Sequence, residues 1–442
     1  MDAPRDTARG ALASPDPTSL NDADTRITTL ANGLRVLTIA LPHLRTAGVS
    51  VFLRSGSAHE SPALNGIGHV VEHMVFKGSA TRDARRINLD AERLGAEVNA
   101  HTDKDHSAFH MRGAAAHATA FVSMLADILL APRFPETELE RERGVLLHEY
   151  ADDEDDPMAT AYRLFDRECY GTQAMAMPVI GTRRNIERFT RADLLAQMQR
   201  QTTAANLVVA AAGAVDHDAI VAAAEAGFGA VARGTENRIE TPVWRGGIAA
   251  RRLDGHSQTH AVLGFPVHGR QHDDGVATLA AALFGEGMSS PMMDELRERR
   301  GLVYYAACSA DVLHACGQFV LEVSTSPEQV DDCLVALRRL LHEQARTITA
   351  IDLERAHSQA TVSSLRLQEK PGRRLEEAAL DLLALGRVRA PAERQAQLDA
   401  VDADALRAAF AAMLERGPAL AIVGKLPRGM GQRAKAIFGA AA

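Results

Sequence analysis

The sequence predicts an α+β protein of two similar domains, each a mostly antiparallel sheet with helices packed on one face. A faint internal duplication is the first observation: a strand-like apolar run followed by a helical stretch that ends in Phe-Gly occurs at residues 207–229 and again at 420–439. Strand-like runs also open each half, at 33–39 and 49–53 and then at 259–265. This succession favours α+β over alternating βαβ units.

Four segments are expected along the 442 residues. Residues 1–22, rich in Asp, Pro, Ala and Ser, are predicted to be a disordered tail, and 23–231 to form the first domain. Residues 232–250 carry turn-forming residues, including two adjacent glycines, and are predicted to be a linker. Residues 251–442 complete the second domain. A chain of this length with 46% hydrophobic residues has ample core for two domains.

Three Ala- and Leu-rich stretches are expected to be helices because their apolar residues recur at helical spacing. They cover residues 114–130, 192–201 and 365–385. Their Met and Leu stripes are interpreted as core packing, and no cofactor-binding motif is indicated among them.

The most informative motif is His69-Val70-Val71-Glu72-His73. On a helix, positions i, i+3 and i+4 are neighbours, so both imidazoles can reach one ion while Glu72 stands beside them and the two valines face inward. Two imidazoles suit Zn²⁺, which in hydrolytic sites takes three protein ligands and a water. Glu72 is then the expected general base. The order His-x-x-Glu-His is the inverzincin signature, the reverse of His-Glu-x-x-His. The alternative interpretation is that these three residues lie on a solvated helix face.

A third ligand is sought in residues 138–150, which are predicted to form a second helix. Glu142 and Glu149 are seven residues apart and share a helix face, although surface carboxylates at that spacing are common. His148 is the nearest competitor, but one residue turns it about 100° from Glu149, so both cannot face one ion. The apolar stripe of this helix is expected to be Leu139, Val145, Leu146 and Leu147.

The chain resembles the inverzincin metallopeptidases that include pitrilysin, insulysin and the mitochondrial processing peptidase, in their half-length form. The resemblance runs from about residue 30 to the C-terminus and includes Gly66-Ile67-Gly68 before the motif and residues 74–79 after it. It implies a zinc-binding catalytic domain over 23–231. The implied zinc ligands are His69, His73 and Glu149, with Glu72 as base and Glu142 as a supporting carboxylate.

Residues 94–102 resemble the edge strand of this family, on which a peptide substrate is added as an extra strand. The resemblance implies that Asn99 and Ala100 contact the substrate backbone. Family members often carry Tyr where this chain has Phe109, so a hydroxyl is absent here.

A second set of residues lies in the other half. Residues 284–290 and 295–304 resemble the glycine-bearing loop of the family and its Arg/Tyr pair, which match Arg297 and Tyr304. A guanidinium and a phenol are suitable donors to a carbonyl and its developing oxyanion. Pro291 departs from the Arg often found in the family.

The resemblance implies a zinc-dependent endopeptidase that cleaves unfolded peptides or small proteins in a closed chamber. Half-length chains of the family pair as a clamshell, so a homodimer, or a heterodimer with a related chain, is expected. Arg297 and Tyr304 would then complete the partner's zinc site. Two alternatives stay open: a catalytic subunit that needs a different partner, and a non-catalytic structural or binding subunit.

Composition excludes some partners. The formal net charge of −8 argues against general nucleic-acid binding, which needs a basic surface. No segment is long and apolar enough to span a membrane, and residues 1–22 contain no secretory apolar run, so a cytoplasmic location is expected. The four cysteines show no C-x-x-C spacing, which indicates neither a disulfide framework nor a zinc knuckle.

Overall fold

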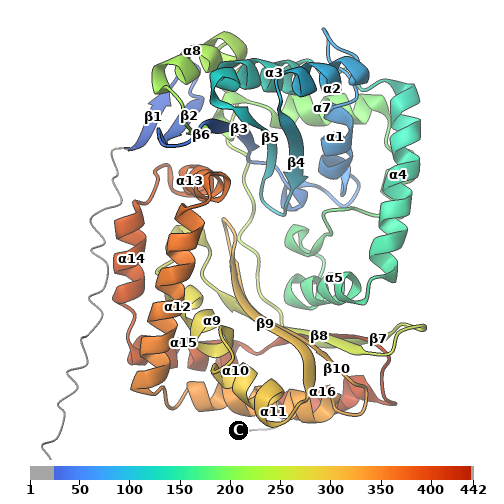
Figure 1. Ribbon diagram of the computed structural model, residues 1–442. Coiled ribbons are helices and arrows are strands. Elements are labelled where there is room, and N and C mark those ends of the chain that lie inside the picture. Colours follow the sequence, from blue (N-terminus) through green and yellow to red (C-terminus); the bar gives the residue numbers. More distant parts are fainter. Residues whose placement is uncertain (1–23, 440–442) are drawn as a thin grey trace, which may run out of the picture.

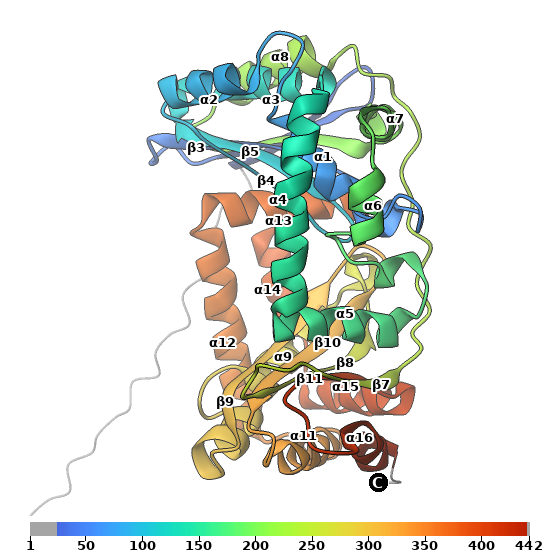
Figure 2. The ribbon, with the colours of Figure 1, turned by 90° about the vertical axis from the view of Figure 1, so that its right-hand side faces the viewer.

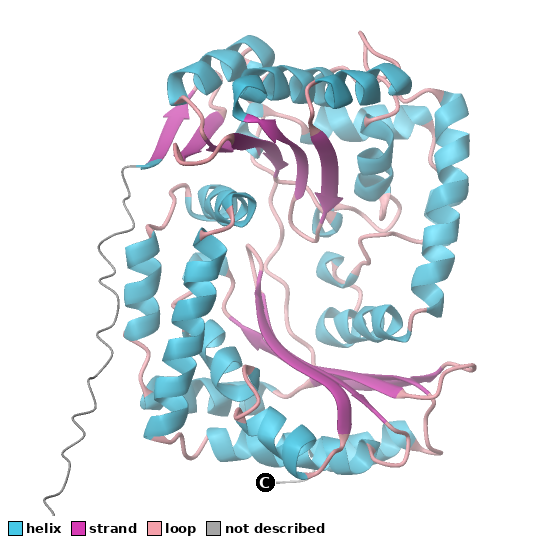
Figure 3. Cartoon of the chain, viewed as in Figure 1, coloured by secondary structure: helices cyan, strands magenta, loops and turns pink. Residues whose placement is uncertain are grey.

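Two β-sheets lie at opposite ends of the molecule, each with its own layer of helices, in a computed structural model that describes residues 24–439 (Figure 1). The predicted α+β class with two similar halves is confirmed, and Figure 3 shows the two sheets as separate magenta layers. The tail predicted for residues 1–22 lies outside the described residues.

The first sheet has six strands in the order β1-β2-β6-β3-β5-β4. Only β2 and β6 pair in parallel, and every other neighbouring pair is antiparallel. The hairpin of β5 and β4 therefore forms one side of the sheet, with β4 as the edge strand. The strands are β1 (Thr25–Thr29), β2 (Arg35–Ala40), β3 (Thr46–Leu53), β4 (Glu97–Thr102), β5 (Ser107–Ala114) and β6 (Leu207–Gly213).

The second sheet repeats this topology with five strands, in the order β7-β11-β8-β10-β9. Here β7 and β11 are the parallel pair, as β2 and β6 are in the first sheet. The match places β9 where β4 lies in the first sheet. The strands are β7 (Gly247–Arg252), β8 (Thr259–Val267), β9 (Val303–Val312), β10 (Gly317–Thr325) and β11 (Ala419–Gly424).

One face of each sheet packs against a layer of helices, and side-chain alternation along the strands selects this face. In β6, Val209 and Ala211 join the helix-covered core, whereas Val208 and Ala210 point to the other side. The first layer consists of α1 (Ile67–Val75), α2 (Ala84–Arg93), α3 (Ala118–Leu130), α7 (Arg191–Gln201) and α8 (His217–Phe228). The second consists of α9 (Val276–Gly285), α11 (Val330–Gln344), α12 (Ala350–Gln368), α15 (Ala403–Arg416) and α16 (Met430–Gly439).

The opposite face of each sheet is covered by a helix from the other half of the chain (Figure 2). Helix α13 (Pro371–Leu385) packs Leu375, Leu382 and neighbouring residues against the first sheet. Helix α5 (Pro157–Tyr170) packs Phe165 and its neighbours against the second. Strands β6 and β11 are consequently buried at every position, which explains their uninterrupted apolar sequences.

Two local predictions are corrected. The single helix expected over 365–385 is two helices, because α12 ends at Gln368 and α13 begins at Pro371. Proline is well suited to the first turn of a helix and disfavours helical geometry at the residue before it. The linker predicted for 232–250 overlaps β7, since Gly247, the second of its adjacent glycines, begins a strand paired with β11.

Among residues 24–439, no helix is long and apolar enough to cross a membrane.

Candidate metal centre

Helix α1 carries the His-x-x-Glu-His motif on the side that faces away from the core. The predicted inward orientation of Val70 and Val71 is confirmed, since their side chains are 1% and 5% exposed. This packing leaves His69, Glu72 and His73 on the opposite side. The buried residues of the helix are Ile67, Val70, Val71, Met74 and Val75.

The buried carboxylate of Glu60 holds the beginning of α1. Its two oxygens accept hydrogen bonds from the backbone N–H groups of Gly66, at 2.7 Å, and Gly68, at 2.8 Å. The Asn65 amide donates a third hydrogen bond, at 3.2 Å. Burial raises the pKa of Glu60 to about 7 against these hydrogen bonds. Sequence reasoning missed this residue, because a lone Glu nine residues before a motif carries no local signal.

Helix α4 (Glu136–Asp155) brings the second group of candidate residues to α1 (Figure 2). Leu139, Glu142 and Leu146 form its buried side, so the carboxylate of Glu142 sits within an apolar stripe. The expectation that Val145 belongs to this stripe is wrong, since it is 47% exposed. Its position on the helix turns it away from Leu139 and Leu146.

Glu149 converges with the two imidazoles. Its Oε2 atom lies 3.8 Å from Nε2 of His69 and 3.5 Å from Nε2 of His73. The two rings lie edge to face, with centroids 4.8 Å apart. The three donor atoms are all within 4.8 Å of one another. His148, the competing ligand, is exposed and is not part of this group.

Glu142 supports His73 from behind. The Nδ1 atom of His73 lies 3.3 Å from Oε2 of Glu142, and Lys77 pairs with Oε1 of the same carboxylate at 2.6 Å. Although burial acts in the other direction, hydrogen bonds from Lys77 and His73 hold the pKa of Glu142 below its ordinary value. An ionised Glu142 fixes the tautomer in which His73 offers the lone pair of Nε2 toward Glu149.

Electrostatics favour an imidazole ligand and a carboxylate base. Burial, together with the nearby His73, lowers the pKa of His69 to about 4, so His69 is neutral at physiological pH. Burial raises the pKa of Glu72 above its ordinary value, against hydrogen bonds from the hydroxyl and backbone N–H of Thr102. Thr102 lies at the end of β4, so the edge strand orients Glu72.

The donor set fits a zinc ion. With bonds of about 2.0–2.1 Å, the ligands of a tetrahedral ion lie roughly 3.3 Å apart. The observed separations of 3.8 and 3.5 Å are a few tenths of an ångström longer. Neutral imidazoles, one carboxylate and a supporting carboxylate behind an imidazole are the ligand types that zinc takes.

A cavity of about 410 Å³ opens beside these residues, between α1, β4, α4 and α5. His69, Glu72 and Glu149 all line it. Tyr162 and Arg163 of α5 also line it, although no sequence pattern had indicated them. Both are engaged, since the Tyr162 hydroxyl bonds to Glu322 and Arg163 pairs with Asp153.

The predicted substrate strand, β4, is at the edge of the first sheet. Asn99 is exposed and Ala100 is half-buried, so the outer side of the strand is accessible. Phe109, on the neighbouring strand β5, pairs with Ala100 and is buried in the core. That these residues contact a substrate stays a prediction.

Arg297 and Tyr304 lie away from the cavity at α1, on the second half. Arg297 is in a π-helical turn (Asp294–Arg299) and Tyr304 at the start of β9. Both are exposed, Tyr304 by 62%. Pro291 begins α10 (Pro291–Met293), capped by Ser290. Neither Arg297 nor Tyr304 lines the cavity that His69 lines, as the structure of residues 24–439 has it. Their catalytic role therefore stays a prediction.

The fold and the candidate centre define a two-half α+β chain that carries a His-x-x-Glu-His helix at a candidate metal site. Residues 35–183 match the family model described as Insulinase (Peptidase family M16), and residues 188–360 match the Peptidase M16 inactive domain. The chain belongs to peptidase family M16, as the resemblance predicted. The family of half-length bacterial chains is thereby confirmed.

One relative supports the same family along nearly the whole chain, and two solved structures share its fold. A protein of Streptomyces coelicolor named an uncharacterized zinc protease is 31% identical over 91% of this chain and 90% of its own length. A protease structure from Helicobacter pylori superposes with a TM-score of 0.83 at 21% identity, covering 90% of this chain and 99% of that one. The structure of a peptidase M16 inactive domain from Pseudomonas fluorescens superposes with a TM-score of 0.84 at 21% identity. It covers 91% of this chain and 99% of that one.

Proposed function

We propose that this chain is a zinc-dependent endopeptidase that cleaves unfolded peptides or small proteins. The observation that carries the proposal is the convergence of His69 and His73 with Glu149, while Glu72 faces the same cavity. The zinc-protease names of its relatives point in the same direction. A zinc ion held by these ligands would lower the pKa of a water molecule and polarise a peptide carbonyl.

The residues of the chain then have separate tasks. Glu72 takes the proton from the attacking water on its carboxylate and passes it to the leaving amine, a role worth roughly 10² to 10⁴ in rate. Its raised pKa suits this exchange, and Thr102 holds its orientation. The outer edge of β4 offers backbone donors and acceptors to an extended peptide. A folded domain cannot present such an extended segment to the strand.

The test is Glu72→Gln in the full chain. The amide fills the same space but cannot accept the proton, so zinc content is expected to match that of the unmodified chain while cleavage of an unfolded peptide falls at least about 100-fold. Glu149→Ala is expected to lose one zinc per chain. Glu92→Gln, on the exposed side of α2, serves as the matched control. Unimpaired hydrolysis by Glu72→Gln refutes the assignment of the base.

The proposal includes a dimer, because Arg297 and Tyr304 lie outside the cavity at α1 and the side chains of both are exposed. A partner whose second half faces this cavity would supply the pair in trans. Mixing Arg297→Ala chains with Glu72→Gln chains tests this arrangement, since mixed dimers contain one intact site. Recovered cleavage supports completion in trans, and two inert proteins that stay inert when mixed contradict it.

The partner is a second copy of this chain or a related chain. Activity of the purified chain together with its size in solution distinguishes the two, because a heterodimeric catalytic subunit is inactive alone. A non-catalytic subunit would be inactive with either partner. The cytoplasmic location stays a prediction from the sequence.

A further inference from the structure

A second cluster of metal-binding side chains lies where the β4–β5 hairpin meets α13. His101 is on β4, His106 directly precedes β5, and Glu376 comes from α13 in the other half of the chain. Nε2 of His101 lies 3.3 Å from Nε2 of His106 and 3.5 Å from Oε1 of Glu376. All three donor atoms are within 4.8 Å of one another.

These separations suit a tetrahedral transition-metal ion, whose ligands lie roughly 3.3 Å apart. The His101 and His106 rings meet edge to face at 89°, so their Nε2 atoms approach from different directions. Two imidazoles and one carboxylate form the same donor set as His69, His73 and Glu149, and no residue is shared between the two sets.

The other nitrogen of each imidazole already has a partner. Nδ1 of His106 lies 2.8 Å from the Asp105 carboxylate, to which it donates. Nδ1 of His101 is hydrogen-bonded to Nε2 of His110 at 3.1 Å, and Nδ1 of His110 to the Ser50 hydroxyl at 2.7 Å. In this arrangement His101 and His106 both direct Nε2 into the cluster, as ligands with supporting hydrogen bonds do.

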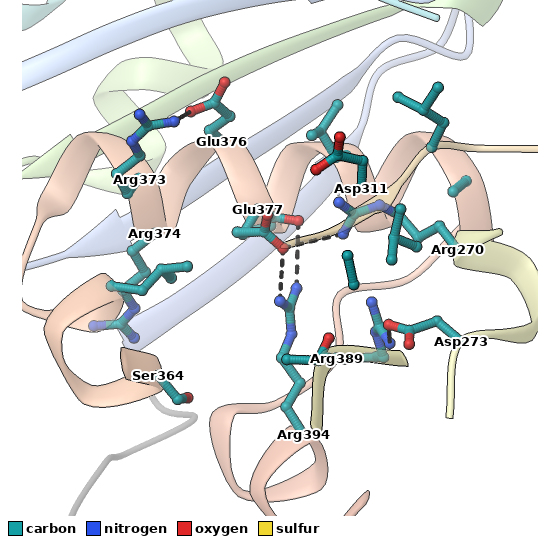
Figure 4. Close-up of a pocket in the computed structure, with 18 of the residues that line it drawn as sticks. Arg270, Asp273, Asp311, Ser364, Arg373, Arg374, Glu376, Glu377, Arg389 and Arg394 are labelled. Carbon is teal, nitrogen blue, oxygen red and sulfur yellow. Dashed lines mark hydrogen bonds and ion pairs between the residues drawn. The ribbon is translucent and has the colours of Figure 1, made fainter. Parts of the chain in front are cut away.

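Local charge favours a cation over two facing lone pairs. The carboxylates of Asp103, Asp105 and Glu376 all favour positive charge at His106. Arg373 pairs with Oε2 of Glu376 at 3.2 Å and leaves Oε1 facing His101. Figure 4 shows this Arg373–Glu376 pair on α13, at the wall of a second cavity of about 930 Å³.

A proton is the competing occupant. Although burial opposes it, Asp105 raises the pKa of His106, so a protonated His106 could donate from Nε2 to His101. Such a proton would satisfy the short contact between the two imidazoles without a metal. The Glu376 carboxylate, brought to the same point from the other half of the chain, can serve an ion as a ligand or a protonated imidazole as a counter-charge, so the zinc titration below distinguishes the two occupants.

We propose that His101, His106 and Glu376 form a second site for a zinc-type divalent ion, distinct from the centre on α1. His106 and Glu376 line the cavity of about 930 Å³, whereas His101 lines the cavity of about 410 Å³ beside α1, so the cluster lies between the two cavities. An ion here ties the edge hairpin of the first sheet to a helix of the second half. Occupancy therefore stiffens the strand that carries Asn99 and Ala100.

The experiment is a zinc titration of the metal-stripped full chain against a chromogenic chelator. The unmodified chain is expected to bind two ions, and Glu376→Gln, His101→Gln and Glu149→Ala one ion each. The double variant Glu149→Ala/Glu376→Gln is expected to bind none. His43→Gln, which removes an exposed imidazole outside the cluster, is expected to retain two.

Thermal midpoints measured in chelator show whether each variant folds. If Glu376→Gln does not fold, His101→Gln replaces it as the variant of the second site. In the Glu149→Ala background, zinc is expected to raise the midpoint, and Glu376→Gln to abolish that rise. The proposal is overturned if the unmodified chain binds one ion that Glu149→Ala removes, or if both cluster variants still bind two. If the centre on α1 fails instead, the unmodified chain binds one ion that Glu149→Ala keeps and Glu376→Gln loses, and the second site stands.

Discussion

At the scale of single residues, Glu142 is a carboxylate that lies behind one of the candidate zinc ligands, His73. Glu142 is buried on α4, yet it holds Nδ1 of His73 and pairs with Lys77. The ion pair keeps Glu142 charged, and its charge selects the His73 tautomer that can bind zinc. Its position inside an apolar stripe is compensated by these two contacts.

Glu142→Gln is expected to weaken zinc binding at the α1 centre by about 10- to 100-fold, because the amide no longer fixes His73 as strongly. Competition with a chelator of known affinity measures the change. Glu140→Gln, an exposed position on the same helix that pairs only with Arg143, is the control. Equal affinities in the two variants would show that Glu142 is not needed to orient His73.

Glu60 makes a pH-dependent contribution to stability. Its pKa is raised by burial from 4.5 to about 7, so folding favours the protonated carboxyl. The associated stabilisation is fully present below pH 4.5 and is lost as the pH rises to about 7. Relative to Glu60→Gln, the free energy of unfolding of the unmodified chain should therefore fall over this interval, by at most about 1.4 kcal/mol per pH unit.

Urea denaturation at pH 4.5 and pH 7.5, in chelator so that metal binding does not contribute, measures the two differences. Groups other than Glu60 cancel in the comparison because both proteins carry them. A difference between the two proteins that is the same at both pH values would contradict the raised pKa.

At the scale of elements, the position of α1 depends on two glycines in contact. Gly66 precedes the helix with φ +94°, and an added Cβ would lie 2.6 Å from the Cα atom of Gly181, which itself has φ +82°. A side chain at either position meets backbone, which cannot move aside as a flexible side chain would. The sequence motif thus acquires its placement from a distant loop.

Gly66→Ala is expected to destabilise the fold by about 1–3 kcal/mol or more, and to displace α1 enough to weaken zinc binding. Chemical denaturation and the zinc titration measure the two effects. Gly144→Ala is the control, because Gly144 is exposed within α4 with open space around it, and alanine there is expected to stabilise the helix by up to about 1 kcal/mol. Unchanged stability in Gly66→Ala would show that the contact with Gly181 tolerates a methyl group.

At the scale of the whole molecule, the two halves exchange helices. Helix α13 covers the free face of the first sheet and α5 that of the second. A buried network holds α13 to its own half, since Asp381 pairs with Arg270, Arg389 and Arg394. The halves are consequently packed into one another rather than joined only by a linker.

Leu382→Ala in α13 should cost about 2–5 kcal/mol and increase hydrogen exchange in β6 of the first sheet more than in β11 of the second. Leu337→Ala in α11, equally buried but within the second core, should show the reverse pattern. Exchange measured by mass spectrometry on both strands checks the prediction. A Leu382→Ala pattern like that of Leu337→Ala would mean that α13 does not protect the first sheet.

Local spacing was enough to predict α1 and the approach of its two imidazoles, because neighbours at i and i+4 meet on any helix. The position of Glu149 was inferred through the family resemblance, since its distance from His73 along the chain contains no geometric information. Helices at 114–130 and 192–201 were predicted close to their observed bounds. The break at Pro371 was missed because apolar recurrence continued across it.

The sequence by itself determined the α+β class, the duplicated architecture and the His69, Glu72 and His73 motif, because each follows from periodicity or from a contiguous motif. Only the tertiary structure decided the exchange of α5 and α13, the contact of Gly66 with Gly181, and the meeting of His101 and His106 with Glu376. These contacts join residues far apart in the chain, and their distances depend on how whole sheets and helices pack. No local pattern of residues encodes that packing.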